Sequence, residues 1–139
     1  LHSVYGFTGG SNISQTFSIG GYHAVSNSQD GPNDLPFKYS VTGLETRVNL
    51  ANGDKNIFIG IRAGVTKVTA TPNSTEIIFS PYHYGVVSGY TFKIWSVISI
   101  GFEGSYLAIE DSSASNGSGT EDYKAFHTIN FFGTIGVMF

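Results

Sequence analysis

The four histidines are the side chains of this sequence with the widest chemical use, since histidine serves as a general base and as a metal ligand. On one face of a strand, a catalytic hydroxyl would lie two residues from the histidine that acts as its base. Two residues after His83 the sequence has Gly85, and two after His127 it has Ile129, so the hydroxyl is missing at both places. Cysteine is absent, which removes disulfides, thiolate metal sites and cysteine nucleophiles. No two histidines have metal-ligand spacing, so the sequence predicts no catalytic residue, metal or cofactor. The histidines are His2, His23, His83 and His127.

Four charged residues form the second group that could do chemistry. Two acids and two bases fall near the middle of three predicted strands, on the strand face that is rich in Gly and Ser. If that face lines the interior of a barrel, the charges must pair, because unpaired buried charges are costly. The network could close the interior, or it could only fill the core and set the strand register. The residues are Glu45, Arg47, Arg62 and Glu103.

The elements that position these residues are predicted to be strands. Residues 123–139 alternate almost without a break, with Ile129, Phe131 and Ile135 on one face and a more polar set on the other. A soluble strand of that length is unusual, whereas a tilted membrane-spanning strand with an extension needs it. Helical periodicity occurs nowhere. We expect strands at 14–26, 36–51, 57–70, 77–92, 95–110 and 122–139, with a possible short strand at 3–8.

The composition suits a lipid-facing surface. The chain of 139 residues forms one domain, 1–139, with 12% charged residues, about half the share in soluble domains. No run approaches the roughly 18 apolar residues of a membrane helix, and the mean hydropathy is only +0.02, so any span must be made of strands. The net charge of −3 argues against a nucleic-acid partner.

The predicted connections alternate in length. Residues 52–56 and 92–94 form tight turns, whereas 27–34, 71–76 and 111–122 are longer and polar, and residues 9–12 are also rich in turn formers. Short turns at one rim and long loops at the other are typical of transmembrane barrels. The Ser/Gly-rich part of the last loop is expected to be mobile and solvated.

The alternation alone does not say which face points inward. The mixed face carries small residues that suit a narrow polar lumen, and the other face carries Ile, Phe, Tyr and Val, so a membrane barrel is favoured over a soluble barrel or sandwich. Aromatic residues also gather at strand ends, as expected for girdles at the two bilayer interfaces. The girdle residues are Tyr82, Tyr84, Tyr90, Phe92, Trp95, Tyr106, Tyr123 and Phe139.

Two segments carry a resemblance to a known family. They are Gly89-Tyr90-Thr91-Phe92-Lys93-Ile94-Trp95-Ser96 and Phe131-Phe132-Gly133-Thr134-Ile135-Gly136-Val137-Met138-Phe139. With them the chain resembles the small bacterial outer-membrane β-barrels of the OmpA/OmpX-like class. The resemblance implies an antiparallel up-and-down barrel of eight strands in the outer membrane, with a removed signal peptide outside this numbering, and with bilayer lipid and lipopolysaccharide as neighbours.

The resemblance also implies roles for particular residues. In that family the barrel-assembly machinery reads a final strand closing on Phe, which here points to Phe131, Ile135, Val137 and Phe139. Lumen charge networks in the family block or gate conduction. The chain departs in its strand count, since only six strands and a possible seventh are predicted; residues 1–12 with a neighbouring segment, or a break at Pro81, could bring the number to eight.

Three functions follow from this pattern. The first is a non-enzymatic outer-membrane barrel with a structural, adhesive or surface-interaction role, contacting partners through loops 27–34, 71–76 and 111–122. The second is a soluble all-β binding module, lipocalin-like or lectin-like. The third is a barrel enzyme resembling the lipid A deacylases, with His83 or His127 as its base. The first is preferred, with His23 and His127 as residues of the outer membrane border.

Overall fold

A computed structural model describes residues 4–26, 29–30, 36–51, 53–70, 76–116 and 119–137 of the chain. Every described element is a β-strand, and within these residues no helix has the length and apolar character needed to cross a membrane. The strands are β1 Val4–Asn12, β2 Phe17–Ser26, β3 Gln29–Asp30, β4 Pro36–Asn49, β5 Lys55–Ala70, β6 Ile77–Phe79, β7 Tyr82–Lys93, β8 Ile98–Ile109, β9 Ser112–Asn116, β10 Gly119–Tyr123 and β11 Phe126–Val137.

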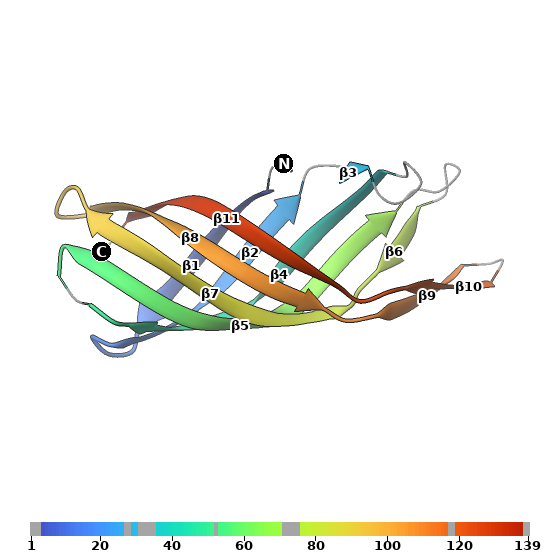
Figure 1. Cartoon of the computed structure of the whole chain (residues 1–139), viewed down its shortest axis with the longest axis horizontal. Coiled ribbons are helices and arrows are strands. Elements are labelled where there is room, and N and C mark those ends of the chain that lie inside the picture. Colours follow the sequence, from blue (N-terminus) through green and yellow to red (C-terminus); the bar gives the residue numbers. More distant parts are fainter. Residues whose placement is uncertain are drawn as a thin grey trace.

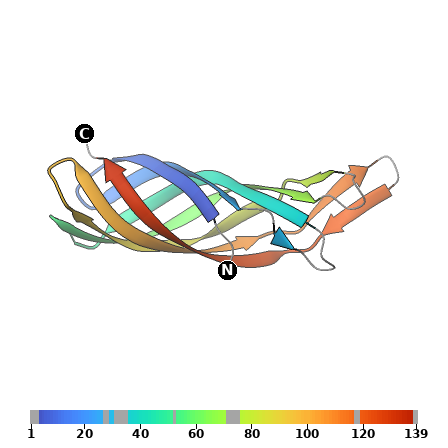
Figure 2. The same cartoon turned by 90° about the horizontal axis from the view of Figure 1, so that it is seen from above.

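The long strands form one curled antiparallel sheet in the order β1-β2-β4-β5-β7-β8-β11. The sheet rolls up until β1 and β11 lie beside each other (Figures 1 and 2). Each long strand pairs with the next along the chain, so the predicted all-β, antiparallel, up-and-down architecture is confirmed. The short connections from β1 to β2, from β4 to β5 and from β7 to β8 lie at one end, called here the short-turn end. The longer connections lie at the opposite, long-connection end.

Pro81 interrupts a strand without adding one to the barrel. The segment predicted at 77–92 divides into β6 and β7, but both pair with β5, and the register runs from Val68–Phe79 to Val65–Tyr82 without a shift. The missing donor of proline accounts for the break. The chain therefore contributes seven long strands to the wall within the described residues.

The predicted mobile loop at 111–122 is wrong in part, because it contains a β-hairpin. β9 pairs with β10, and the pairing of Ser112 with Tyr123 continues the register in which Ile109 pairs with Phe126. Because the β8–β11 ladder already sets this register, a Ser-rich sequence of weak strand propensity can extend it. The hairpin projects from the long-connection end in Figures 1 and 2. The loops predicted at 27–34 and 71–76 lie largely outside the described residues.

Residues 9–12 belong to β1 and do not form the predicted turn. Gly9 and Gly10 lie opposite Gly21 and Gly20, and a side chain on Gly10 would come within 2.4 Å of the Ile19 carbonyl oxygen. Gly10 and Gly20 therefore allow close strand approach where the sequence pattern suggested a turn. The turn follows at 13–16, so the strand predicted from residue 14 begins at Phe17; likewise β8 begins at Ile98 and leaves Trp95 in a turn.

The apolar face of the sheet points outward. Ile61 is 64% exposed and Phe131 is 81% exposed, whereas the alternate residues Phe58 and Val87 are buried inside. The mixed face is therefore the inner one. The inside is less polar than predicted, because an apolar cluster fills it towards the long-connection end. That cluster consists of Tyr22, Ala24, Tyr39, Val41, Val68, Ile77, Phe79 and Leu107.

Candidate functional site in the barrel interior

The structure brings the four predicted charged residues together as a closed ring of ion pairs. Arg62 donates from Nε to Glu45 Oε2 at 2.8 Å and from Nη2 to Glu103 Oε1 at 2.6 Å. Arg47 donates from Nε to Glu45 Oε1 at 2.6 Å and from Nη2 to Glu103 Oε2 at 3.1 Å. Each guanidinium thus bridges both carboxylates, and all four carboxylate oxygens accept a charge-assisted hydrogen bond.

Strand register explains how residues distant in the sequence meet. Glu45 on β4 lies directly opposite Arg62 on β5, and Arg47 follows two residues later on the same inner face. Glu103 comes from β8 and reaches the ring across the bore, while its neighbour on β7 is Gly89, where a side chain would collide with the Phe58 ring. Because Gly89 has no side chain, the interior has room there for the long side chains of the charged residues.

Further contacts fix the ring to the wall. The Thr8 hydroxyl of β1 donates to Glu45 Oε1 at 2.8 Å. The guanidinium of Arg47 lies 4.2 Å from the centre of the Phe58 ring, and that of Arg62 lies 4.6 Å from the centre of the Tyr22 ring. These cation–π contacts add to the ion pairs. Glu45, Arg62 and Glu103 are each buried, with Arg62 only 5% exposed, whereas the Arg47 side chain is 18% exposed.

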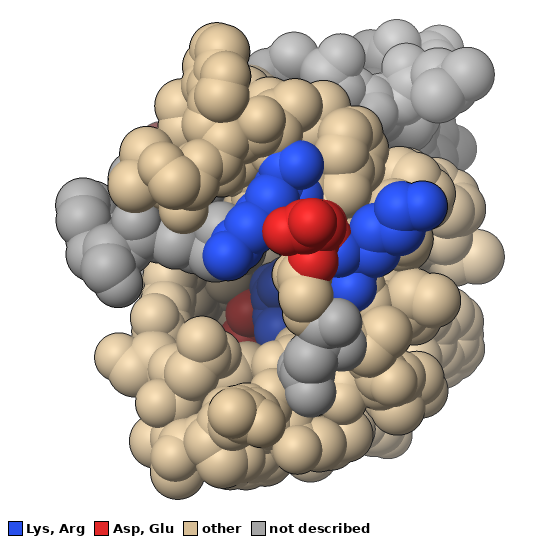
Figure 3. All heavy atoms as spheres, turned by 90° about the vertical axis from the view of Figure 1, so that its left-hand side faces the viewer, with Lys and Arg blue, Asp and Glu red and all other residues tan. Residues whose placement is uncertain are grey.

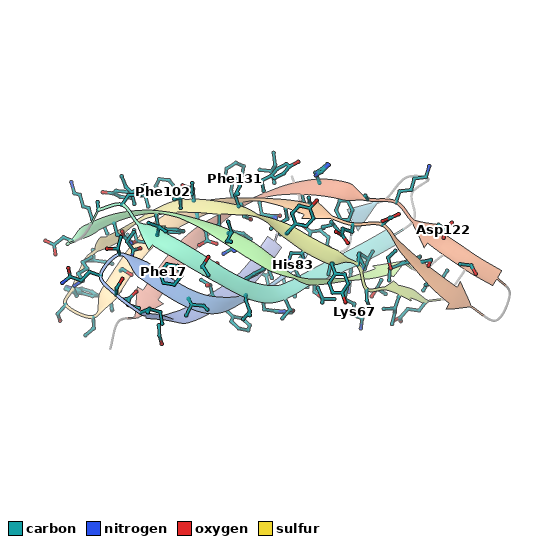
Figure 4. All side chains as sticks on the ribbon, turned by 90° about the horizontal axis from the view of Figure 1, so that it is seen from below. Phe17, Lys67, His83, Phe102, Asp122 and Phe131 are labelled. Atoms are coloured by element: carbon teal, nitrogen blue, oxygen red, sulfur yellow. The ribbon has the colours of Figure 1, made fainter. Side chains whose placement is uncertain are left out.

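Next to the ring, His83 forms a cluster with the hydroxyl groups of Tyr22 and Thr66, called here the histidine cluster. The sequence did not predict it. His83 is 1% exposed, its Nε2 is hydrogen-bonded to the Tyr22 hydroxyl, and its Nδ1 lies 2.9 Å from Thr66 Oγ1. Figure 4 shows His83 within the barrel. The two hydroxyls come from β2 and β5, so spacing along β7 could not reveal them; only the cross-strand register could. The His83 ring is therefore enclosed within the barrel.

The other two described histidine sites face outward. His23 Nδ1 lies 2.7 Å from Thr42 Oγ1, and His127 Nδ1 lies 2.9 Å from the Tyr106 hydroxyl. Both histidines lie in the half of the wall nearer the long connections. His2 is outside the described residues. Among the residues that the structure describes, no group of three His, Asp or Glu side chains could hold a metal ion.

Five of the eight predicted girdle residues lie at one end of the wall or the other. Tyr82 and Tyr84 are exposed at the long-connection end of β7, and Tyr90 and Phe92 lie at its other end with ring centres 6.2 Å apart. Trp95 is exposed in the turn at 94–97. Tyr106 lies on the outer face beside His127 rather than at a strand end. The Tyr123 side chain and Phe139 are outside the described part of the chain.

The residues predicted as an assembly signal lie on the outer face of β11 where they are described. Phe131 and Ile135 are exposed there, and Figure 4 shows Phe131 pointing away from the sheet. The Val137 side chain and Phe139 are not described. At the short-turn end, charged residues stand out on an otherwise uncharged surface, and more charged atoms lie recessed in the hollow at its centre (Figure 3).

Comparison with known proteins supports the fold alone. No protein-family model matches the sequence, and neither does any curated protein. The solved structure of Neisserial surface protein A (NspA) superimposes with a TM-score of 0.79 at 11% sequence identity, covering 99% of this chain and 84% of that chain. NspA is an eight-strand outer-membrane β-barrel. The chain therefore has the fold of the small outer-membrane barrels.

Proposed function

We propose that this protein is a non-enzymatic β-barrel of the bacterial outer membrane, with an interior closed by the charge ring and a projecting hairpin that contacts other surfaces. The observation that carries the proposal is the outward apolar face, with Ile61 and Phe131 exposed around a buried ring of charges. A soluble lipocalin-like or lectin-like module would bury that face. Lipid instead of water around the wall makes the same arrangement favourable.

The charge ring is evidence that the barrel interior does not conduct ions. Its two guanidinium groups bridge two strands on one side of the bore to a third strand on the other. The apolar cluster fills the interior beyond it, and a barrel of about eight strands is just wide enough to be filled by side chains. Both layers narrow the path that an ion would have to take, and the ring is the layer that bridges opposite sides of the bore.

Conductance across a planar lipid bilayer tests this closure. The native protein should give no conductance steps, whereas replacing Glu45, Arg47, Arg62 and Glu103 together by Ser should produce them. Replacing Lys55 and Lys93 by Ser changes charge only at the short-turn rim and is the matched control. Steady steps from the native protein contradict the proposal, and a silent four-residue variant would assign closure to the apolar cluster instead.

The hairpin of β9 and β10 supports the surface role. At about 3.3 Å per residue, residues 110–116 extend roughly 23 Å along the strand beyond the β8–β11 ladder. Glu110, Asp111 and Asp122 are exposed on it or beside it, and Asp122 is labelled there in Figure 4. A polar, acidic, projecting hairpin favours contact with a polar partner that carries positive charge.

Deleting the hairpin separates an adhesive role from a structural one. Residues 112–123 are replaced by an Asn-Gly turn, and bacteria carrying either form are measured for self-aggregation and for attachment to epithelial monolayers. If the hairpin is adhesive, its deletion should reduce self-aggregation or attachment, while the amount of the protein in the membrane stays the same. Asp111→Asn with Asp122→Asn, in the intact hairpin, tests whether charge carries the effect. Unchanged attachment and aggregation in all forms contradict the surface role and leave a structural one.

Lipopolysaccharide is the proposed neighbour of the outer rim. Lys38 and Lys67 are exposed on the outer face near the long connections, and because Ser40 pairs with Lys67 the two lysines lie diagonally across β4 and β5. Figure 4 shows the position of Lys67 on this surface. Cations at this level suit lipid phosphate groups. We expect Lys38→Gln with Lys67→Gln to reduce the stabilisation that lipopolysaccharide gives to the protein in detergent.

The barrel-assembly machinery is the second proposed partner. Its supporting observation is the outward face of β11, where Phe131 and Ile135 are available at one edge of the sheet. Phe131→Ala with Ile135→Ala should lower the amount of folded protein in the membrane, whereas Ile59→Ala with Ile61→Ala, on the outer face of β5, should lower it less. Equal losses contradict a special role for the final strand.

A further inference from the structure

The outer wall of the barrel carries an open groove of about 640 Å³ across the neighbouring strands β1, β2 and β4 (Figure 1). Its floor is bare backbone, because Gly9 of β1 lies opposite Gly21 of β2, and a Cβ on Gly9 would meet no atom within 4 Å. Two exposed apolar side chains stand beside this floor. They are Phe7 on β1 and Leu44, which lies opposite Gly21 on β4. An apolar hollow therefore interrupts the bulky side chains of the wall.

A hydrogen-bonded pair lines the end of the groove nearer the long connections. His23 Nδ1 lies 2.7 Å from Thr42 Oγ1, and the His23 ring packs against Phe7 with ring centres 5.6 Å apart. When the Thr42 hydroxyl donates to Nδ1, the neutral ring carries its proton on Nε2. Among the residues that the structure describes, Nε2 has no hydrogen-bond partner. His23 can therefore donate to a group that enters the groove from outside.

Two cations lie beyond this pair on the same outer face. Thr42 is paired with Val65 on β5, and Lys67 follows two residues later, about 7 Å further along the strand. Lys38 precedes Thr42 on β4, nearer the long connections. Both lysines are exposed. From the long-connection end towards the middle of the wall, the surface thus presents positive charge, then a hydrogen-bond donor, then an apolar hollow.

This order matches a lipid that lies along the wall. A phosphate group, an ester or amide carbonyl and an acyl chain follow one another in the same order. Lipid tails around the barrel are all apolar, so a preference for one chain must come from its van der Waals fit in a groove and from its headgroup. The groove supplies the fit, and the lysines supply a charge complementary to phosphate.

We infer that the groove holds one acyl chain of a lipopolysaccharide molecule whose phosphate lies at Lys38 and Lys67, with His23 donating to a carbonyl between them. This inference rests on the proposed outer-membrane function and adds a defined site to the lipopolysaccharide contact proposed above. Two neighbouring lysines favour lipopolysaccharide phosphates, whose negative charge is uncompensated, over phosphatidylethanolamine, whose ammonium group offsets its phosphate.

Native mass spectrometry of the protein in mild detergent tests the site with lipid A, the acylated and phosphorylated part of lipopolysaccharide. Gly21→Leu fills the groove, since a Cβ there meets its nearest atom at 3.5 Å. We expect it to weaken lipid A binding about tenfold, the effect of losing roughly two buried CH₂ groups. The matched control is Gly133→Leu, which adds the same bulk at an open position on β11 and should leave binding unchanged.

A second ligand tests the acyl chain without relying on a variant. The phosphorylated disaccharide of lipid A, stripped of its acyl chains, should bind more weakly than lipid A, and equally to the native protein and to Gly21→Leu. If Gly21→Leu lacks the heat-modifiable form of a folded barrel, Gly9→Leu takes its place, because a Cβ on Gly9 meets no atom within 4 Å.

The other outcomes overturn the inference in distinguishable ways. If lipid A binds the native protein and Gly21→Leu equally, but binds Lys38→Gln with Lys67→Gln more weakly, the groove is not a site and the contact at the rim stands. If neither change affects lipid A binding, or the native protein binds none, the rim contact fails as well. Equally tight binding of phosphatidylethanolamine or phosphatidylglycerol would assign the groove to a phospholipid.

Discussion

At the scale of single residues, Arg62 is the group whose loss the barrel should tolerate least. It is 5% exposed and bonds to both Glu45 and Glu103, so Arg62→Met leaves two buried carboxylates with only Arg47 between them. Removing one partner of a buried ion pair costs about 3–5 kcal/mol. We expect a loss of that size in the free energy of unfolding, measured by urea titration in lipid vesicles through the fluorescence of Trp95.

The matched control is Arg47→Met. Arg47 bonds to the same two carboxylates but is 18% exposed, so water can solvate what its removal leaves unpaired. Its loss should be clearly smaller. Equal losses for the two variants would contradict the view that Arg62 is the centre of the ring.

A substitution at Gly64 tests how closely β4 and β5 must approach each other. It faces Gly43 across β4 and β5, and a methyl group there would come within 2.1 Å of the Thr42 carbonyl oxygen, so Gly64→Ala must push the strands apart. We expect a loss of ~1–3 kcal/mol in the free energy of unfolding. At Gly21 the nearest atom would be 3.5 Å away. Gly21→Ala should therefore be nearly neutral, and a similar loss at both sites would refute the argument.

Sequence reasoning identified the charge ring but missed the histidine cluster, for a physical reason. Glu45, Arg62 and Glu103 stand out because charges on an alternating face are rare and must pair. Nothing in the sequence around His83 or Thr66 marks either residue as special. They come into contact only through the pairing register of their strands, which the spacing along one strand does not reveal. Partners across a sheet become visible only when strand pairing is known.

At the scale of elements, the orientation of the barrel gives a direct prediction. Ser113 is exposed on β9 at the long-connection end, and Gln15 is exposed in the turn at 13–16 at the opposite end. A maleimide reagent that does not cross membranes should label Ser113→Cys on intact cells. It should label Gln15→Cys only after the outer membrane is permeabilised. Labelling of Gln15→Cys alone on intact cells would show that the orientation is reversed.

Strand existence was predictable from the sequence, but strand ends were not. Alternation identified the long strands because one face is consistently apolar. Residues 9–12 and the Ser-rich 112–116 were misassigned, since glycine and serine are turn formers by local propensity. In the structure both segments extend ladders that neighbouring strands already set. Tertiary pairing overrides weak local preference in such places.

At the scale of the whole molecule, the sequence could not tell the inside of the barrel from its outside. A soluble barrel and a membrane barrel share the same alternation, with opposite faces buried. The bulk of the apolar face favoured the membrane form, and the exposure of Ile61 and Phe131 agrees with it.

Extraction from membranes, followed by electrophoresis with and without boiling, tests the central claim most directly. If the apolar face meets lipid, the protein should stay with membranes in alkaline carbonate and come out with detergent. The unboiled form should migrate differently from the boiled form, because a closed barrel resists unfolding by dodecyl sulfate. Protein that is soluble without detergent, with one mobility in both states, would contradict the claim and place the Ile/Phe face inside a soluble module.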